Sequence, residues 1–260
     1  MEQSDKARNF AALHVKGEPL VIFNAWDAGT ANAAQEIGAK AIATGSYAVA
    51  LAHGFEDGER IPLDLVLANL ERIARAVKVP VSLDFEGGYT TDPMQLRGNI
   101  TRVLNAGAIG INFEDQVVGG SGLHGIEEQA ERIAAVRESS DAQSIPLFVN
   151  ARTDVFLPLD PAAHTEEHLE EAIQRSLAYA DAGANGFFAP GLVSATLIER
   201  LCRECPIPVN ILVRAGVPSS RELADLGVAR ISYGGATYRT AIDAFKKAGR
   251  DALSATTSSS

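Results

Sequence analysis

Short apolar runs alternate with longer stretches of mixed apolar and polar residues along most of the 260-residue chain. The runs show no regular polar alternation, which is typical of strands in a parallel sheet that is covered on both faces. A half-exposed strand would instead alternate apolar and polar positions. We therefore predict eight strands, at residues 20–24, 41–45, 80–84, 109–113, 146–150, 185–188, 208–213 and 229–233.

The stretches between the strands carry the period of amphipathic helices. In the clearest of them, at 61–78, Leu70, Ile73 and Val77 belong to one apolar stripe. A further helix is predicted before the first strand, at 3–14. The remaining helices are predicted at 28–37, 93–105, 127–139, 165–181, 194–204, 219–226 and 237–251.

The residues that lead into the strands alternate between two types. Odd-numbered strands begin with or follow Pro, and even-numbered strands follow a Gly that can end a helix in the left-handed conformation. Such alternation fits a closed barrel, because neighbouring strands of a barrel supply different interior layers. The predicted fold class is therefore α/β, a single-domain (β/α)8 TIM-type barrel over residues 1–253 with a short N-terminal helix. An open doubly wound sheet is the alternative, and residues 254–260 are predicted to be disordered.

Composition narrows the classes of partner and compartment. The chain is 46% hydrophobic and 22% charged, which excludes a largely disordered protein. Its net charge of −10 leaves no basic stripe for nucleic acid, and no apolar run approaches the ~20 residues of a membrane helix. The first residues lack the apolar core of a secretory signal. Cys202 and Cys205 form a lone CxxC, interpreted as packing thiols in a reducing, cytoplasmic compartment.

Acidic residues follow two neighbouring strands at the ends where a barrel of this type places its active site. Asp84 and Glu86 end the third strand, and Glu114 and Asp115 end the fourth. Carboxylates that converge on one point repel each other unless a cation lies between them. Oxygen ligands select a hard ion, so we predict Mg²⁺, with Mn²⁺ also possible. Ion pairing with Arg152, or plain solvation, is the alternative.

Other polar residues at these strand ends predict substrate contacts. Arg152 follows the fifth strand, where a guanidinium can hold a carboxylate or phosphonate with two hydrogen bonds, or can pair with Glu114 instead. Ser46 follows a Gly after the second strand and could offer its hydroxyl and amide to an oxyanion. Asn210 lies in the seventh strand. Trp26, after the first strand, could line the pocket or pack in the core.

Five sequence strings at these positions resemble the isocitrate lyase and phosphoenolpyruvate mutase superfamily, and they occur in the family's order. The resemblance implies an α/β barrel, usually a tetramer, that binds Mg²⁺ and a 2-oxoacid. It also implies an enzyme that makes or breaks a C–C or P–C bond next to an enolpyruvate-like intermediate. The strings are TGSYAVALAHGFED (44–57), LDFEGGY (83–89), INFEDQ (111–116), SGLHG (121–125) and NARTD (150–154).

The resemblance assigns metal roles to four acids. Asp84 matches the principal Mg²⁺ ligand, and Glu86 stands where the family usually has a second Asp. Asp57 matches an acid that holds the metal through water, and Glu114 matches an acid farther from the ion. Because all four supply oxygen, the implied site suits a hard dication.

The resemblance also implies the residues that contact the substrate. Ser46, with the amide of Tyr47, matches the oxyanion contact, and Arg152 matches the Arg that contacts the acidic group of the substrate. The family often has Gly where Tyr47 stands, so this ring is expected to narrow the pocket.

The loop after the fourth strand departs from the family pattern. Family lyases that split isocitrate or methylisocitrate carry KKCGH there, with Cys as the acid, whereas residues 117–125 read VVGGSGLHG. The Lys, or Thr and Asn, of mutases and phosphonopyruvate hydrolases are also missing. His124 or Ser121 could transfer the proton instead. We therefore predict a Mg²⁺-dependent lyase or decarboxylase that cleaves a C–C bond of a small 2-oxo or 2-hydroxy diacid.

Two other functions stay open, as does the assembly. Phosphoenolpyruvate mutase or phosphonopyruvate hydrolase activity would act on a P–C bond, and a non-catalytic barrel would bind a 2-oxoacid without turnover. A homo-oligomer, dimer or tetramer, is expected from the resemblance. Family members often exchange a C-terminal helix within a dimer; this chain stops soon after its eighth helix, so whether it makes the exchange stays open.

Overall fold

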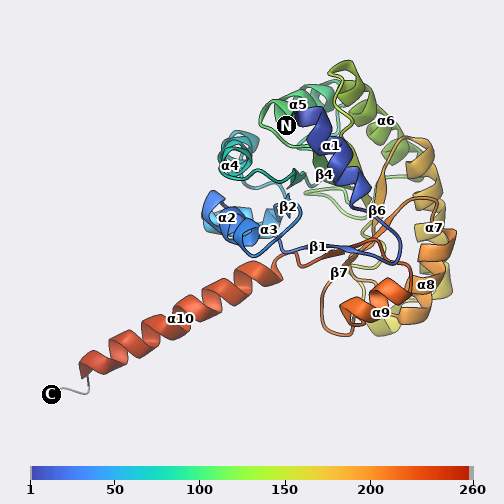
Figure 1. Cartoon of the computed structure of the whole chain (residues 1–260). Helices are drawn as coiled ribbons and strands as arrows, with labels where there is room; N and C mark the ends of the chain where they lie inside the picture. The colour runs from blue at the N-terminus through green and yellow to red at the C-terminus, as the bar shows by residue number, and fades with distance from the viewer. Residues whose placement is uncertain (1, 258–260) are drawn as a thin grey trace.

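The structure is a computed structural model that describes residues 2–257 (Figure 1). Each predicted strand is present. The strands are β1 (Leu20–Ile22), β2 (Ile42–Ala43), β3 (Val81–Asp84), β4 (Gly110–Glu114), β5 (Phe148–Arg152), β6 (Gly186–Phe188), β7 (Val209–Leu212) and β8 (Arg230–Ser232). The helices are α1 (Gln3–Ala12), α2 (Ala28–Glu36), α3 (Ser46–Ala52), α4 (Leu63–Ala76), α5 (Pro93–Asn105), α6 (Ile126–Ala142), α7 (Glu166–Asp181), α8 (Ala195–Glu204), α9 (Ser220–Asp225) and α10 (Ala236–Thr257), with a 3₁₀ turn η1 (Pro161–Ala163).

The eight strands form one sheet in the order β1-β8-β7-β6-β5-β4-β3-β2, and every pair is parallel. A parallel bridge between Ala25 and Thr44 joins the carboxyl ends of β1 and β2, and the Ala25 amide donates to the Ala43 carbonyl at 3.0 Å. The sheet therefore curls into a nearly closed barrel. This confirms the predicted (β/α)8 fold, because an open doubly wound sheet would not place its strands in sequential order around a ring.

Four glycines end helices at the predicted positions before even-numbered strands. Gly38, Gly107, Gly183 and Gly227 have φ between 88° and 101°, a region that side-chain-bearing residues seldom adopt. At Gly107 a Cβ atom would also lie 2.9 Å from the Cβ of Ala74. The turn from helix to strand is therefore specified locally by the sequence.

Helix α1 closes the amino end of the barrel. Its Phe10 is fully buried against residues at the beginnings of several strands, including Leu20, Ile109 and Phe148. A Cβ on Gly110 would lie 2.9 Å from the Phe10 ring, so the ring fits against bare backbone at that point. The N-terminal helix predicted at 3–14 is confirmed, and its aromatic side chain completes the apolar lower layer.

Two helical segments differ from the predictions. Helix α3 begins at Ser46, where no helix was predicted; residues 48–52 are rich in strong helix formers, which accounts for the extra helix. Helix α10 continues to Thr257, so residues 254–257 are helical although the sequence predicted disorder from 254 onward. Residues 258–260 of that predicted tail lie outside the described residues.

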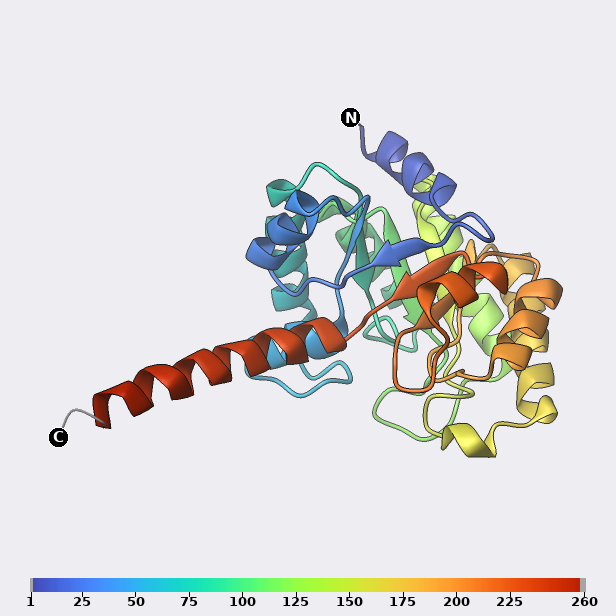
Figure 2. The ribbon, with the colours of Figure 1, turned by 60° about the horizontal axis from the view of Figure 1, so that its bottom comes forward.

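Helix α10 points away from the barrel instead of packing on it (Figures 1 and 2). Its Phe245 is 77% exposed. The barrel wall that an eighth helix would cover is correspondingly bare, because Val21 and Phe23 on the outer side of β1 are each 44% exposed. None of the helices within residues 2–257 is long and apolar enough to cross a membrane.

Candidate active site

A cavity of about 570 Å³ opens at the carboxyl end of the barrel. Its wall is built from the last residues of β3, β5, β6 and β7 and from segments that follow β2, β5, β6, β7 and β8, which is the end of the barrel where the sequence predicted the site. Charged and polar side chains face it from opposite parts of the ring. They include Ser46, Tyr47, Asp57, Asp84, Arg152, Arg214 and Arg239.

Asp84 is held in place by its neighbours at the end of β3. One carboxylate oxygen accepts a hydrogen bond from the Ser46 amide at 2.9 Å, and the other lies 3.4 Å from the Asn112 amide nitrogen. The Asp84 amide donates to the Thr44 hydroxyl at 2.9 Å. The Ser46 amide, predicted to serve an oxyanion, is thus bonded to Asp84 in this structure, and it positions that carboxylate at the cavity wall.

Glu86 and Asp57 surround Asp84 with further negative charge. Asp84 and Glu86 were both predicted to end the third strand, but β3 ends at Asp84, and Glu86 has φ 52°, outside extended backbone. Glu86 is nevertheless buried close to the other acids: burial first, and then Asp84 and Asp57, raise its pKa to about 8. Burial and the charge of Asp84 also raise the pKa of Asp57. Asp57 and Asp84 therefore line the cavity, and Glu86 lies buried near them.

Arg152 is fixed between two carboxylates. Its Nη1 lies 2.7 Å from Glu114, while Nε and Nη2 donate to the two oxygens of Asp154 at 2.6 and 2.7 Å. Although burial alone would lower the pKa of Arg152, Glu114 and Asp154 raise it. Burial raises the pKa of Glu114 in spite of Arg152. The structural pair with Glu114, raised as the alternative from sequence, is present.

Asp115, the fourth acid of the predicted cluster, is directed into a separate buried network. Its carboxylate accepts from Arg175 at 3.0 Å, from the Tyr179 hydroxyl at 2.8 Å and from the Asp154 amide at 3.0 Å. This carboxylate is already paired with a cation, so it has no need of a metal. Its role is to tie the β4 and β5 loops to α7.

The remaining acids are compatible with a divalent cation. No three His, Cys, Asp or Glu side chains in residues 2–257 are already arranged around a common metal position. Mg²⁺, however, commonly binds one or two carboxylates and keeps several waters. The mutual repulsion of Asp57, Asp84 and Glu86 is what a hard cation would relieve. On their chemistry, the oxygen donors present fit Mg²⁺ or Mn²⁺.

The other predicted site residues lie away from the cavity wall. His124 is buried, with Nδ1 2.8 Å from Glu128, and Ser121 is exposed in its loop. Asn210 is buried in the barrel interior, where its Oδ1 accepts from the Ser232 hydroxyl at 3.1 Å. Trp26 packs edge-on against Tyr238, with ring centroids 5.2 Å apart.

Two cationic residues of the cavity wall were missed by the sequence analysis. Arg214 lies two residues after β7, and Arg239 lies in the first turn of α10, after β8. The rule that catalytic groups follow barrel strands, applied to Arg152, also points to Arg214. Arg239 could have been found in the same way, because the strand predicted at 229–233 and the helix predicted at 237–251 already place it in the first helical turn after the last strand.

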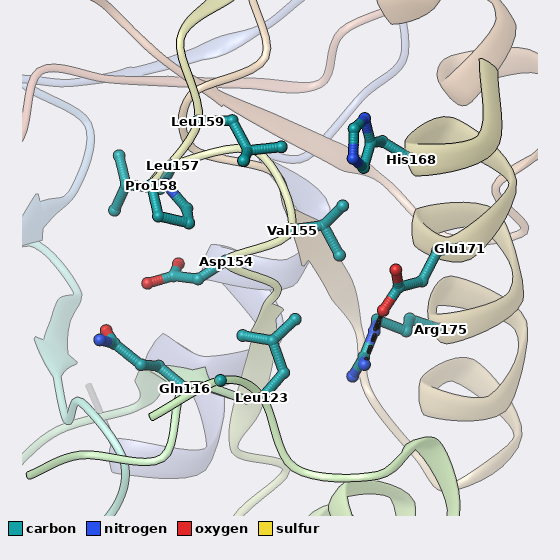
Figure 3. A pocket seen from close by; sticks show the side chains of 11 residues that line it. Gln116, Leu123, Asp154, Val155, Leu157, Pro158, Leu159, His168, Glu171 and Arg175 are labelled. Atoms are coloured by element: carbon teal, nitrogen blue, oxygen red, sulfur yellow. Dashed lines mark hydrogen bonds and ion pairs between the residues drawn. The ribbon is translucent and has the colours of Figure 1, made fainter. Parts of the chain in front are cut away.

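A second cavity, of about 650 Å³, lies beside the first between the β4 and β5 loops and α7 (Figure 3). Leu157 lines both cavities. Glu171 and Arg175, which line the second cavity, form an ion pair at 2.9 Å. Apolar side chains make much of the remaining wall of this cavity, among them Leu123, Val155 and Leu159 (Figure 3). None of the predicted site residues lines this second cavity.

Comparison with known proteins agrees with the barrel fold. The family model described as phosphoenolpyruvate phosphomutase matches residues 10–253. The chain belongs to this family. The match spans nearly the whole barrel and confirms the resemblance seen in the five sequence strings.

Members similar to this chain act on different substrates. The 2-methylisocitrate lyase of Salmonella typhimurium is 30% identical over 88% of this chain and 79% of its own length. A crystal structure of a proposed phosphonomutase from Burkholderia cenocepacia J2315 is 42% identical and covers 96% of this chain and 100% of that one, with a TM-score of 0.94. A phosphonopyruvate hydrolase in complex with oxalate and Mg²⁺ has a TM-score of 0.81 at 22% identity over 95% and 88%, and so shows the fold alone.

Proposed function

We propose that this protein is a Mg²⁺-dependent lyase or decarboxylase that cleaves a C–C bond of a small 2-oxo or 2-hydroxy diacid. The observation that carries the proposal is the crowding of negative charge among Asp57 and Asp84, which line the cavity, and the buried Glu86 near them. Such an arrangement destabilises the fold unless it binds a cation. The named lyase among its relatives supports C–C bond cleavage.

Asp84, Glu86, Asp57 and Glu114 would hold the Mg²⁺, or a Mn²⁺ in its place. When bound, the ion supplies a Lewis acid that lowers the energy of negative charge developing on a 2-oxoacid as its bond breaks. The hydrolase that carries Mg²⁺ and oxalate supports this choice of ion.

The side chains around the acids position the substrate. Ser46 fixes Asp84 through its amide, and Tyr47 narrows the entrance. Arg152 is immobilised by Glu114 and Asp154, so the N–H groups that these acids leave free are pre-oriented for an oxyanion in the cavity.

Proton delivery is the least constrained step. Ser121 is exposed, and His124 contacts Glu128, so either residue must be brought to the cavity by movement of the loop at 117–125. Loops of this kind often close over a bound substrate.

P–C bond chemistry is the second candidate, and the 42% identity to a proposed phosphonomutase favours it.

The test of the proposed function is pyruvate release from a panel of 2-oxo and 2-hydroxy diacids, with and without EDTA, run beside phosphorus NMR on phosphonopyruvate and phosphoenolpyruvate. EDTA-sensitive pyruvate release from a diacid would support the lyase. Conversion of the phosphorus compounds without any turnover of the diacids would contradict the lyase and support P–C bond chemistry instead. Tight oxalate binding without any turnover would indicate a non-catalytic 2-oxoacid-binding barrel.

We also propose that the chain forms a homo-oligomer in which α10 packs on a second copy. Helix α10 leaves the barrel with Phe245 exposed, and an apolar groove of about 350 Å³ along β1, with Val21, Phe23 and Ile37 in its wall, lies open. Light scattering should report a dimer or tetramer that Phe23→Glu and Phe245→Glu each dissociate. A monomeric parent protein would contradict the proposal.

A further inference from the structure

Two loops at the mouth of the barrel hold each other through reciprocal hydrogen bonds. The Glu59 amide donates to one carboxylate oxygen of Glu86 at 2.8 Å, and the Tyr89 amide donates to the Glu59 carboxylate at 2.8 Å. The Tyr89 hydroxyl donates to the other oxygen of Glu86 at 3.3 Å. Glu59 lies between α3 and α4, and the other two residues follow β3. The contact therefore joins the loop that carries Asp57 to the loop that carries Glu86.

The three residues of this contact adopt a backbone conformation that residues with side chains disfavour. Glu59, Glu86 and Tyr89 have φ of 57°, 52° and 61°, in the left-handed region. Within residues 2–257, Ser144, in the turn between α6 and β5, is the one other non-glycine residue with positive φ. Strained backbone persists where the surrounding structure fixes it, and it clusters where a site is pre-organised. The concentration of such residues here indicates that this contact serves the acids beside it.

The contact orients Glu86 and leaves it able to bind a cation. Each carboxylate oxygen of Glu86 accepts one hydrogen bond, whereas an ionised carboxylate has about four lone-pair positions. Lone pairs on both oxygens therefore remain for a cation or for its waters. Because Glu86 is 4% exposed, the Glu59 amide and the Tyr89 hydroxyl restrict a side chain that has little room to move.

The loop of Glu86 is also anchored independently of Glu59. Arg132 is buried, and its Nη2 donates to the carbonyl of Gly87 and, at 3.2 Å, to the carbonyl of Thr90. Arg132 thus holds carbonyl groups of the loop, while the Glu59 carboxylate holds an amide group. Loss of the Glu59 carboxylate should loosen the loop without releasing it, so variants at residue 59 are expected to fold.

We propose that Glu59 is a positioning residue for the cation site: its carboxylate holds the loop after β3, and its amide orients Glu86 towards the ion. The proposal rests on the proposed function, since it assumes that Mg²⁺ or Mn²⁺ binds among Asp57, Asp84 and Glu86. Asp57 and Glu86 come from different loops, and ligands bind a cation more tightly when their separation is fixed beforehand. Glu59 acts through Glu86 and does not contact the ion itself.

The test measures Mn²⁺ affinity by electron paramagnetic resonance, and Mg²⁺ affinity by competition, so it needs no substrate. Glu59→Gln keeps an oxygen that can accept from the Tyr89 amide, and Glu59→Met keeps the length of the side chain without an acceptor. Glu59→Gly also releases the left-handed backbone. Ser144→Gly is the matched control, because it releases the same backbone conformation away from the mouth. Each variant is also made in a Glu86→Gln background, and circular dichroism checks folding.

We expect Glu59→Met and Glu59→Gly to weaken Mn²⁺ binding by roughly tenfold, and Glu59→Gln and Ser144→Gly to stay within about threefold of the parent protein. In the Glu86→Gln background the further loss from Glu59→Met should fall below about twofold, because its effect is transmitted through Glu86. A merely structural role would give the same loss in both backgrounds.

Three results would overturn the assignment of Glu59 while leaving the cation site in place. They are parent-like affinity in folded Glu59→Met, an equal loss in Glu59→Gln, and an undiminished loss in the Glu86→Gln background. Glu59→Gly provides the same comparison if Glu59→Met does not fold. Failure of the parent protein to bind Mn²⁺ or Mg²⁺ would overturn the proposed function, and the assignment of Glu59 with it.

Discussion

The two ends of the barrel are built on opposite principles. At the amino end, α1 covers the strands with Phe10, and His14 stacks on Phe148 with ring centroids 4.1 Å apart. At the carboxyl end, Asp57 and Asp84 line an open cavity, and the buried Glu86 lies near them. The same strands therefore begin in an apolar layer and end in a group of like charges.

The charges at the two ends are also handled differently. Burial first, and then Arg230, lower the pKa of His14 to about 3, so the imidazole is neutral at physiological pH. Its Nδ1 lies 2.8 Å from the Phe10 carbonyl and, in the neutral ring, must be the donor. At the mouth, burial and Asp84 raise the pKa of Glu86 to about 8. His14 at the amino end is uncharged beside the buried Arg230, whereas the acids at the mouth retain an electrostatic cost that a ligand can relieve. This contrast separates a stabilising region from a functional one.

The strongest test of the comparison is Asp84→Asn. If the mouth is built to hold a dication, this change should lower kcat/KM on any active diacid by at least about 100-fold and abolish the rise in Tm that Mg²⁺ gives the parent protein. Steady-state kinetics and thermal melts with and without Mg²⁺ measure both effects. Asp64→Asn, a surface acid paired with Arg102, is the control. A variant with the parent's activity and the parent's Mg²⁺ shift would remove the basis of the site.

The amino end can be tested by Phe10→Ala. The ring is fully buried, so its removal should lower the free energy of unfolding by about 3–5 kcal/mol, measured by urea denaturation. Met94→Ala, at a position 70% exposed, should change it by less than about 0.5 kcal/mol. Oxalate binding with Mg²⁺ should survive in folded Phe10→Ala protein. A loss of that binding equal to the Asp84→Asn effect would show that the two ends are not separable.

The pH dependence of stability should reveal His14. The unfolded chain titrates this residue near 6.5 and the folded protein near 3, so the unfolded state binds more protons between these values. The contribution of the neutral His14 side chain to the free energy of unfolding is complete above pH 6.5. Below pH 6.5 this contribution falls by up to about 1.4 kcal/mol per pH unit. His14→Phe keeps an aromatic ring on Phe148 and should flatten that slope. Urea titrations at several pH values between 4.5 and 7.5 would measure how the free energy of unfolding of each protein depends on pH. The same slope in the parent protein and in His14→Phe would refute the buried neutral imidazole.

The smallest effect concerns the two cysteines near the amino end. Burial, and then Cys205, raise the pKa of the Cys202 thiol to about 12, and burial also raises the pKa of Cys205. Thiolates are the reactive form, so both thiols should react with DTNB far more slowly at pH 8 in the native protein than in urea. Two thiols that react at once in the folded protein would show that this end is more open than the structure indicates.

Local sequence was enough to predict most of the architecture. The glycines before β2, β4, β6 and β8 impose left-handed helix ends, and apolar runs without alternation require a sheet covered on both faces, so the barrel followed from short-range rules. The acids at the ends of β3 and β4 could likewise be placed at one mouth, because parallel strands end on the same side.

Tertiary structure alone decided which of these acids share a site. Asp115 turns to Arg175 and Tyr179, and Arg152 is divided between Glu114 and Asp154, although all of these residues follow neighbouring strands. It also decided that Arg214 and Arg239 face the acids and that α10 leaves the barrel. A strand's sequence fixes the end at which a side chain lies. The direction of that side chain and its charged partner depend on residues brought near by ring closure and loop paths, which no local pattern records.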